Sequence, residues 1–287
     1  MSALLITGAS GYLGSRVTKE LLNQGHAVVA LTRNSHDVPA AHKNLTICPL
    51  DQMTPQDVFA AHHIDGIFHF ATCYGRGGQN AAEVASVNLL LPLTLLSLGV
   101  EQGTRFFINT DTILQPNINS YSLTKHQFAQ WLAFYAEQIK VVNMRLDHFY
   151  GPHDHPVKFI AWLIKNFKEN ADHIDLTEGA QTRDFVYIDD VVAAYVCVFN
   201  ALDKLPVGKF NNFEVGSGVK TSIKEMVLKL QKLMNKPQVK LNFGAVPYRK
   251  HEMLDYTVDI SALERLGWAP HVFVEDGLQK IITEEGL

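Results

Sequence analysis

The chain has 287 residues, of which 47% are hydrophobic and 19% are charged. This near-average composition excludes a disordered or fibrous chain. With 25 Lys and Arg against 29 Asp and Glu, the net charge is −4. No run of like charges is present, which argues against a general nucleic-acid or anionic-membrane binder. The longest apolar runs, 27–31 and 89–93, are far shorter than the roughly 20 residues of a membrane helix.

The N-terminus and the cysteines favour a cytoplasmic protein. The first six residues lead directly into a glycine-rich turn, without the basic segment or cleavage site of a signal peptide. Cys48, Cys73 and Cys197 cannot form a disulfide framework, and none belongs to a CxxC pair. The 13 histidines show no HExxH or Cys/His spacing typical of a metal site. We therefore expect reduced thiols, no metal and a cytoplasmic location.

The first 150 residues alternate short apolar segments with longer amphipathic ones. Apolar side chains at helical spacing predict helices at 12–24, 83–98 and 121–138. Short apolar segments bounded by turn or polar residues predict strands at 3–7, 27–32, 45–48, 66–71, 105–109 and 140–146. This alternation is typical of a parallel sheet with helices on both faces. We predict a Rossmann-type, doubly wound α/β domain over residues 1–150.

Beyond Gly151 the regular alternation ends. Short helices at 157–167 and 221–234 are separated by loops and by short strands such as 208–215. We predict a smaller α/β substrate-binding lobe over residues 151–287, from which residues 184–200 return to the first domain.

A glycine-rich turn, Thr7–Gly14, joins the first predicted strand to the first predicted helix. In a dinucleotide-binding fold the first glycine permits a tight turn, the second lets the backbone approach a pyrophosphate, and the third allows close helix packing. Backbone N–H groups and the helix dipole then hold the anion. The strand–turn–helix context favours this function over a fortuitous glycine-rich turn. The predicted cofactor ligands here are Gly8, Ser10, Gly11, Tyr12, Leu13 and Gly14.

The end of the second strand indicates which dinucleotide is bound. An NAD enzyme usually carries an acidic residue there for the ribose 2′-hydroxyl, whereas this chain has Arg33. A guanidinium suits the additional phosphate of NADP, so we expect NADP(H) in preference to NAD(H). The alternative is that Arg33 is an ordinary surface charge. Asp51 ends a later extended segment, where it could contact the adenine or cap the helix that begins near Thr54.

Tyr121 and Lys125 lie four residues apart at the start of a predicted helix, so their side chains share one face. We expect the cation to lower the pKa of the phenol from about 10 toward neutrality. The tyrosine could then exchange a proton with an alcohol or ketone while a hydride moves to or from nicotinamide. Thr110, with Thr112 as its rival, could hydrogen-bond the carbonyl oxygen. A YxxxK pattern is common on protein surfaces, and its place after the fifth strand favours catalysis.

These residues resemble the extended short-chain dehydrogenase/reductase family, of the NAD-dependent epimerase/dehydratase type. The likeness covers nearly the whole chain and includes Ala71, Asn88 and the segments 145–152 and 181–191. The sequence RDFVYIDDV within the last segment is the most specific feature and is typical of nucleotide-sugar enzymes. The resemblance implies that Ala71 and Asn88 contact the cofactor. It also implies that the second lobe binds a nucleoside-diphosphate sugar through Arg183, Arg249 and Glu252.

Departures from the family pattern bear on the reaction. Dehydratases of this family carry an Asp-Glu pair, whereas Asp111 is followed here by Thr112, so the acid/base couple for water elimination is missing. The resemblance implies that Cys73 and Arg76 contact the sugar. His148 stands where Asn is common, so it either contacts the substrate or packs behind the site. These features are most similar to the small CDP-paratose and CDP-abequose synthases. That group reduces the C4 ketone of a CDP-4-keto-3,6-dideoxyhexose with NADPH, for surface polysaccharides such as the O-antigen.

The leading interpretation is an NADPH-dependent 4-ketoreductase for a nucleotide-linked deoxysugar. An NAD-dependent nucleotide-sugar 4-epimerase would use the same Tyr–Lys–Thr set and is the alternative, with a non-catalytic NADP-binding regulator as a minor one. We expect no nucleic-acid or membrane partner. We also expect a homodimer built on the helices at 83–98 and 121–138, although their apolar faces could instead pack on the sheet. The nucleotide base and the configuration at C4 stay open.

Overall fold

The computed structural model describes every residue except 1–2, 34–37, 39–41 and 250–251. The chain forms two compact units, one of Met1–Leu146 with Tyr195–Phe213 and the other of Asp147–Ala194 with Glu214–Leu287. The sequence-based boundary followed residue 150, with a return at 184–200. In the structure the first crossing follows Leu146, and the return begins at Tyr195, part-way along a helix.

A seven-stranded sheet forms the centre of the first unit, in the order β10-β6-β5-β4-β1-β2-β3. Its strands are β1 (Ala3–Thr7), β2 (Ala27–Thr32), β3 (Leu45–Pro49), β4 (Gly66–His69), β5 (Phe106–Thr112), β6 (Lys140–Leu146) and β10 (Phe210–Val215). Every pairing from β3 across to β6 is parallel. This strand order is that of a Rossmann sheet, so the predicted fold class is confirmed.

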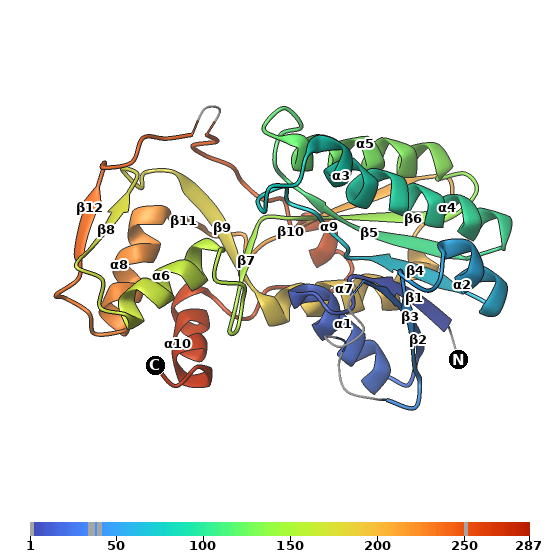
Figure 1. The fold of residues 1–287 in the computed structure, drawn as a ribbon, viewed down its shortest axis with the longest axis horizontal. Coiled ribbons are helices and arrows are strands. Elements are labelled where there is room, and N and C mark those ends of the chain that lie inside the picture. Colours follow the sequence, from blue (N-terminus) through green and yellow to red (C-terminus); the bar gives the residue numbers. More distant parts are fainter. Residues whose placement is uncertain (1–2, 34–37, 39–41, 250–251) are drawn as a thin grey trace. The chain divides into compact units, whose positions relative to one another are not determined.

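Helices cover both faces of this sheet (Figure 1). One face carries α2 (Pro55–Ala61), α3 (Ala81–Ala85), the π-helical turn η2 (Ser86–Leu90), α4 (Leu91–Glu101) and α5 (Ser120–Tyr135). The other face carries α1 (Tyr12–Asn23) and the end of α7 (Ile188–Asn200), which is followed by the 3-10 turn η3 (Leu202–Lys204). Strand side chains such as Leu5, Ile67, Phe107 and Val141 are fully buried in the core. Cover on both faces explains why these strands are apolar along most of their length.

The helix expected at 83–98 is interrupted by the π-helical turn at Ser86–Leu90. Pro92 has no N–H to donate to the carbonyl of Asn88, four residues earlier, so a regular α-helix would leave that carbonyl without its partner. A single π turn is the usual way for a helix to absorb such a defect, and such turns are frequent at functional sites.

The helical stretch Ala81–Glu101 has 21 residues and is long and apolar enough, by length and composition alone, to cross a membrane. The separate apolar runs in the sequence did not predict this. About a third of its most apolar part is buried within the chain. Val84, Leu95 and Leu96 are fully buried, as in the core helix of a globular domain.

The second unit contains two small sheets. In the three-stranded sheet β9 (Thr182–Tyr187) lies between β7 (His148–Tyr150), which is parallel to it, and β11 (Lys220–Ser222), which is antiparallel. In the two-stranded sheet β8 (His173–Leu176) pairs parallel with β12 (Lys240–Phe243). The remaining helices are α6 (Phe159–Lys168), α8 (Ile223–Leu233), α9 (Ser261–Glu264) and α10 (Val274–Glu284). The predicted α/β architecture of the smaller lobe is therefore confirmed.

Candidate active site

The turn between β1 and α1 leaves no room for a side chain at Gly8 or Gly14. Gly8 has a φ of +70°, and a Cβ there would lie 2.7 Å from the backbone nitrogen of Ala71. A Cβ on Gly14 would lie 2.1 Å from the Gly8 carbonyl oxygen. Gly11 caps α1 and offers no side-chain hydrogen bond to its first turn. The backbone N–H groups in the first turn of α1 therefore lack a side-chain cap, as at the helix N-terminus that binds the pyrophosphate of a dinucleotide.

The other residues predicted in this turn support its shape. The Ser10 hydroxyl lies 3.3 Å from that of Thr32 at the end of β2. The guanidinium of Arg16 lies over the ring of Tyr12, 3.9 Å from the ring centroid. The Leu13 side chain is buried in the core. The contact of Ser10 with Thr32 connects the turn to the end of β2, where the sequence predicts the cofactor.

Arg33 and Asp51 both lie on the surface of the first unit. Arg33 directly follows β2 and is exposed. Asp51 is also exposed, in the turn before α2. Thr54 caps α2 in a capping box with Asp57, so the alternative in which Asp51 caps this helix is wrong.

Asn88 is completely buried and uses its side chain within the protein. Its Oδ1 accepts from the Cys73 backbone nitrogen at 2.8 Å, and its Nδ2 donates to the Cys73 carbonyl at 2.8 Å and to the Thr124 hydroxyl at 3.2 Å. These bonds anchor the loop after β4, and a direct contact of Asn88 with the cofactor stays a prediction.

Lys125 is buried near the start of α5, one turn after Tyr121. The helix begins at Ser120 because the Asn119 side chain caps its first turn. The Lys125 ammonium donates to the carbonyl of Thr110 at 2.9 Å. Burial lowers the pKa of Lys125 to about 8, although the Asp111 carboxylate opposes this shift. This amine can therefore exchange a proton close to neutral pH.

The pKa of Tyr121 is raised, chiefly by burial and next by the phenol of Tyr74. A hydrogen bond with Thr112 lowers this pKa, as does the charge of Arg76. The expectation that the pKa of Tyr121 falls toward neutrality is wrong for this structure, because desolvation of the phenolate outweighs the hydrogen bond with Thr112 and the charge of Arg76. Tyr121 is therefore a protonated phenol near neutral pH.

The two candidate hydroxyls have different partners. The Thr110 hydroxyl lies 2.7 Å from the hydroxyl of Tyr195 on α7. The Thr112 hydroxyl is hydrogen-bonded to Tyr121 and also accepts from the Leu114 backbone nitrogen at 3.2 Å. Thr112 is thus the threonine hydroxyl in direct contact with the phenol.

A buried polar network surrounds the carboxylate next to these threonines. Asp111 accepts from the backbone nitrogen of Thr112 at 2.7 Å and from Asn143 Nδ2 at 2.8 Å. Asn143 is itself hydrogen-bonded to Asn109 at 2.8 Å and to Asn212 at 2.9 Å. Protein donors thus occupy both oxygens of Asp111. Its negative charge raises the pKa of Lys125 and so acts as a counter-charge for the buried ammonium.

Tyr74 is a site residue that the sequence did not reveal. Its ring centroid lies 5.0 Å from that of Tyr121, and the Arg76 guanidinium lies 5.5 Å from the Tyr74 ring. The loop that contains Cys73 and Arg76 therefore packs against the phenol. The position of Tyr74 between the predicted ligands Cys73 and Arg76 could have suggested a role in the site. The sequence alone could not predict that its ring packs on Tyr121.

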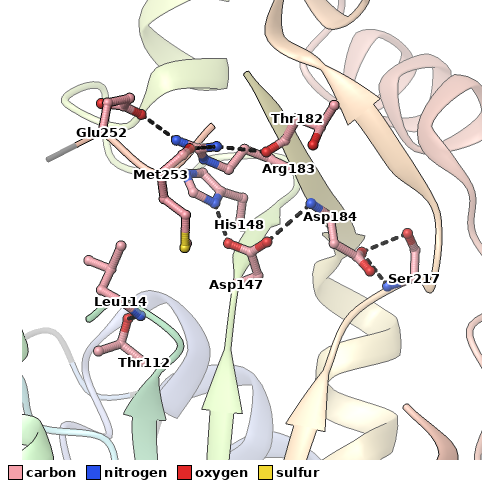
Figure 2. A network of polar contacts seen from close by, with 10 residues as sticks. All are labelled: Thr112, Leu114, Asp147, His148, Thr182, Arg183, Asp184, Ser217, Glu252 and Met253. Carbon is pink, nitrogen blue, oxygen red and sulfur yellow. Dashed lines mark hydrogen bonds and ion pairs between the residues drawn. The ribbon is translucent and has the colours of Figure 1, made fainter. Parts of the chain in front are cut away.

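In the second unit Arg183 on β9 is buried, and both terminal nitrogens of its guanidinium have protein partners (Figure 2). Its Nη2 bonds the carboxylate of Glu252, and its Nη1 donates to the carbonyls of Thr182 at 2.6 Å and Met253 at 2.7 Å. Arg249 is exposed, and its carbonyl accepts from the backbone nitrogen of Glu252 at 3.0 Å. The structure thus pairs Arg183 with Glu252 through their side chains, and Arg249 meets Glu252 through its backbone carbonyl.

His148 opens β7 in the same unit, and its imidazole bonds to the carboxylate of Asp147 (Figure 2). Figure 2 also shows Asp147 joined to the backbone of Asp184. Neither aspartate was singled out as a site residue, because their contacts join segments that are far apart in the sequence.

Comparison with known proteins agrees with this geometry. The model of the NAD dependent epimerase/dehydratase family matches residues 4–216, which is most of the chain. The chain belongs to this family. The family resemblance deduced from the motifs is therefore confirmed.

Relatives of this family member are matched over almost their whole length. CDP-abequose synthase of Salmonella muenchen is 32% identical, over 98% of this chain and 97% of the relative. The dTDP-D-glucose 4,6-dehydratase of Mus musculus is 26% identical, over 97% of this chain and 87% of its own. Among solved structures, UDP-glucuronic acid 4-epimerase from Bacillus cereus, in complex with UDP-glucuronic acid and NAD, has a TM-score of 0.84. It is 22% identical and the match covers 99% of both chains, which supports the fold.

Proposed function

We propose that this epimerase/dehydratase family member reduces the C4 ketone of a nucleotide-linked deoxysugar, such as a CDP-4-keto-3,6-dideoxyhexose, with NADPH. The observation that carries the proposal is the hydrogen bond of Thr112 to Tyr121, one helical turn from the buried Lys125. This set can deliver one proton to a carbonyl oxygen. Similarity to CDP-abequose synthase over nearly the whole chain supports the substrate class.

The residues present fit a reduction better than an elimination of water. The carboxylate of Asp111 is already held by two donors, and Thr112 stands where a dehydratase would need a second carboxylate. A bound NADPH would supply the hydride to C4. Tyr121 gives its phenolic proton to the C4 oxygen, and Thr112 donates a hydrogen bond to the same oxygen. The raised pKa of Tyr121 keeps the phenol in the protonated form that this step requires.

Lys125 restores the phenol after each turnover in this proposal. Its ammonium, with a pKa of about 8, gives a proton to the phenolate of Tyr121 and then takes one from solvent. Each reduction therefore consumes one hydride and one proton, and the ketone becomes an alcohol.

We propose NADP(H) as the cofactor because Arg33 stands exposed directly after β2, where a guanidinium can reach a 2′-phosphate. Arg33→Asp should raise the ratio of the KM for NADPH to the KM for NADH by about tenfold or more. A ratio that does not change would make Arg33 a surface charge. An NAD-dependent 4-epimerase is the second candidate, because the structurally similar Bacillus cereus epimerase is in complex with NAD.

We also assign the substrate-binding roles that the resemblance implies. Arg183 and Arg249 hold the diphosphate, with Glu252 as the partner of the first guanidinium. Cys73 and Arg76 contact the sugar from the loop after β4. The reaction would belong to the synthesis of deoxysugars for surface polysaccharides, in the cytoplasm.

The direct test of this function combines the purified protein with NADPH and CDP-4-keto-3,6-dideoxyglucose. One NADPH should be oxidised for each ketone reduced, and the configuration of the product at C4 then names the sugar. If no NADPH is oxidised and the purified protein carries NAD, the epimerase is the better description.

We propose that the protein is a homodimer formed through α4 and α5. Trp131 and Phe134 on α5 are 42% and 69% exposed, and Leu90 and Leu123 are exposed as well. Exposed apolar side chains on neighbouring helical segments are typical of an interface, and a second copy of the chain would bury them. Phe134→Glu should convert the dimer to a monomer in light scattering. If the variant is still a dimer, this surface is not the dimer interface.

A further inference from the structure

Four neighbouring strands of the first unit carry a row of buried polar side chains across the sheet. Its members are Thr7 on β1, His69 on β4, Asn109 on β5 and Asn143 on β6, each 1% exposed or less. Each residue lies opposite the next in the parallel register, so the four side chains project from one face. The His69 ring lies 6.0 Å from the Phe128 ring on α5, which places the row beneath the helix that carries Lys125.

The carboxylate of Asp111 fixes the direction of the hydrogen bonds at one end of this row. A carboxylate only accepts, so Asn143 presents its Nδ2 to Asp111, at 2.8 Å. The side-chain oxygen of Asn143 then accepts from Asn109 Nδ2, also at 2.8 Å. This leaves Oδ1 of Asn109 as the acceptor for a donor from the neighbouring strand β4.

Thr7 fixes the tautomer of His69 at the other end of the row. The Thr7 hydroxyl accepts the backbone N–H of Ala71 at 3.2 Å and lies 2.8 Å from His69 Nδ1. Within the described chain this hydroxyl has no other partner, so its own proton goes to Nδ1. Burial, and next the charge of Lys125, hold the pKa of His69 well below its usual range. The imidazole is therefore neutral and carries its proton on Nε2.

The row has one gap, between His69 and Asn109. Among the residues that the structure describes, neither His69 Nε2 nor Asn109 Oδ1 has a hydrogen-bond partner, although both atoms are buried. The first is a donor and the second an acceptor, and their residues lie opposite each other in the sheet. Buried polar atoms without a partner are costly, and a buried water with two or more polar partners is a common way to satisfy them.

We propose that one buried water accepts from His69 Nε2–H and donates to Asn109 Oδ1. An unbroken series of donors then runs from the Ala71 N–H to the Asp111 carboxylate, and each bond polarises the next. His69 is thus a positioning residue, which acts through the two asparagines on the counter-charge of Lys125. This inference rests on the proposed function only for its catalytic readout.

NMR of the wild-type chain with 15N-labelled histidine tests the tautomer and the water directly. His69 should carry its proton on Nε2 at every pH from about 6 to about 9, with Nδ1 unprotonated. The Nε2 proton should show a nuclear Overhauser effect to water. A ring protonated on Nδ1, or an Nε2 proton without contact to water, would overturn the inference.

Two buried threonines provide a matched pair of variants. Thr7→Val removes the donor to Nδ1, so both tautomers of His69 should appear, and the unfolding equilibrium constant should rise about tenfold. Thr18→Val is the control, because the Thr18 hydroxyl is equally buried but has no partner in the described chain. This control should leave the tautomer unchanged and should not raise the unfolding constant.

A double-mutant cycle tests whether the row is continuous. His69 and Asn143 lie on strands that β5 separates, and the proposed chain connects them only through Asn109. The combined effect of His69→Leu and Asn143→Leu on the unfolding constant should differ from the product of the single effects by about threefold or more. Independent effects would mean that the gap is real. If either variant fails to fold in a thermal melt, the imidazole spectra of the wild type and Thr7→Val decide the question.

Turnover tests the positioning role. His69→Leu should lower kcat by about tenfold and leave the KM of the keto sugar within about twofold, because the variant alters the group beside Lys125 and no substrate contact. Thr18→Val should keep the kcat of the wild type. An unchanged kcat in a folded His69→Leu variant would overturn the positioning role. A chain that shows the predicted tautomer and water but does not oxidise NADPH would refute the reductase and leave the buried row intact.

Discussion

The two units of this molecule differ in how far their buried cations are compensated by neighbouring groups. In the first unit the ammonium of Lys125 is buried with incomplete compensation, and its pKa falls to about 8. In the second unit the guanidinium of Arg183 is matched by Glu252 and by two backbone carbonyls. This contrast fits the proposed roles, in which Lys125 moves a proton near neutral pH and Arg183 holds an anion from a position that is fixed in advance.

The sharpest way to test this comparison is to remove the phenol. Tyr121→Phe should lower kcat by about a thousandfold, because the C4 oxygen loses its proton donor, and should leave cofactor affinity nearly unchanged. Single-turnover kinetics and fluorescence titration with NADPH measure the two effects. Tyr135→Phe, on the same helix but bonded to Ser97, is the control and should retain full activity.

Lys125→Met should lower kcat by about a hundredfold and weaken cofactor binding. It should also stabilise the fold near neutral pH by about 1–3 kcal/mol, because a buried ammonium is removed. The folded state has the lower pKa, so the unfolded chain binds more protons between about pH 8 and the ordinary value of 10.5, and stability rises with pH there. Urea unfolding across this range should show the rise in the wild type and none in the variant. A variant less stable than the wild type would contradict the first half of the comparison.

The two threonines can be separated by parallel substitutions. Thr112→Val should lower kcat by about 10–100-fold, because the hydroxyl bonded to Tyr121 is lost. Thr110→Val breaks only the contact with Tyr195 and should cost less than about fivefold. The reverse order of effects would assign the carbonyl contact to Thr110.

The smallest expected effect on kcat lies in the second unit. Arg183→Lys should raise the KM of the substrate by about fivefold, because an ammonium cannot keep the fork that bonds Glu252, Thr182 and Met253 together. The value of kcat should stay within about twofold. A large fall in kcat would mean that the second unit takes part in the chemical step.

Much of the fold could be predicted because its strands are apolar and sharply bounded. β1, β2 and β6 have the bounds expected from the sequence. β5 was expected to end at Asn109 but continues to Thr112, since its polar side chains are satisfied by buried partners such as Asn143. Local polarity therefore suggested a strand end where tertiary hydrogen bonds allow the strand to continue.

The candidate site was predictable only where spacing along the chain carries the information. The interval between Tyr121 and Lys125 indicated a shared helix face, and both lie on the first turns of α5. The packing of Tyr74 on the phenol and the bond between Tyr195 and Thr110 join distant segments, for which the sequence offers no signal. The direction of the Tyr121 pKa shift was mispredicted because burial is a tertiary property.

The central claim is that hydride reaches C4 of a nucleotide-linked sugar while Tyr121 supplies the proton. The most direct measurement is the reaction of the keto sugar with NADPH that carries deuterium at the transferable position, followed by NMR of the product. We predict one deuterium at C4 for each NADPH consumed, and incorporation about a thousandfold slower with Tyr121→Phe. An unlabelled product, or a product formed without consumption of NADPH, would contradict the claim and favour the epimerase.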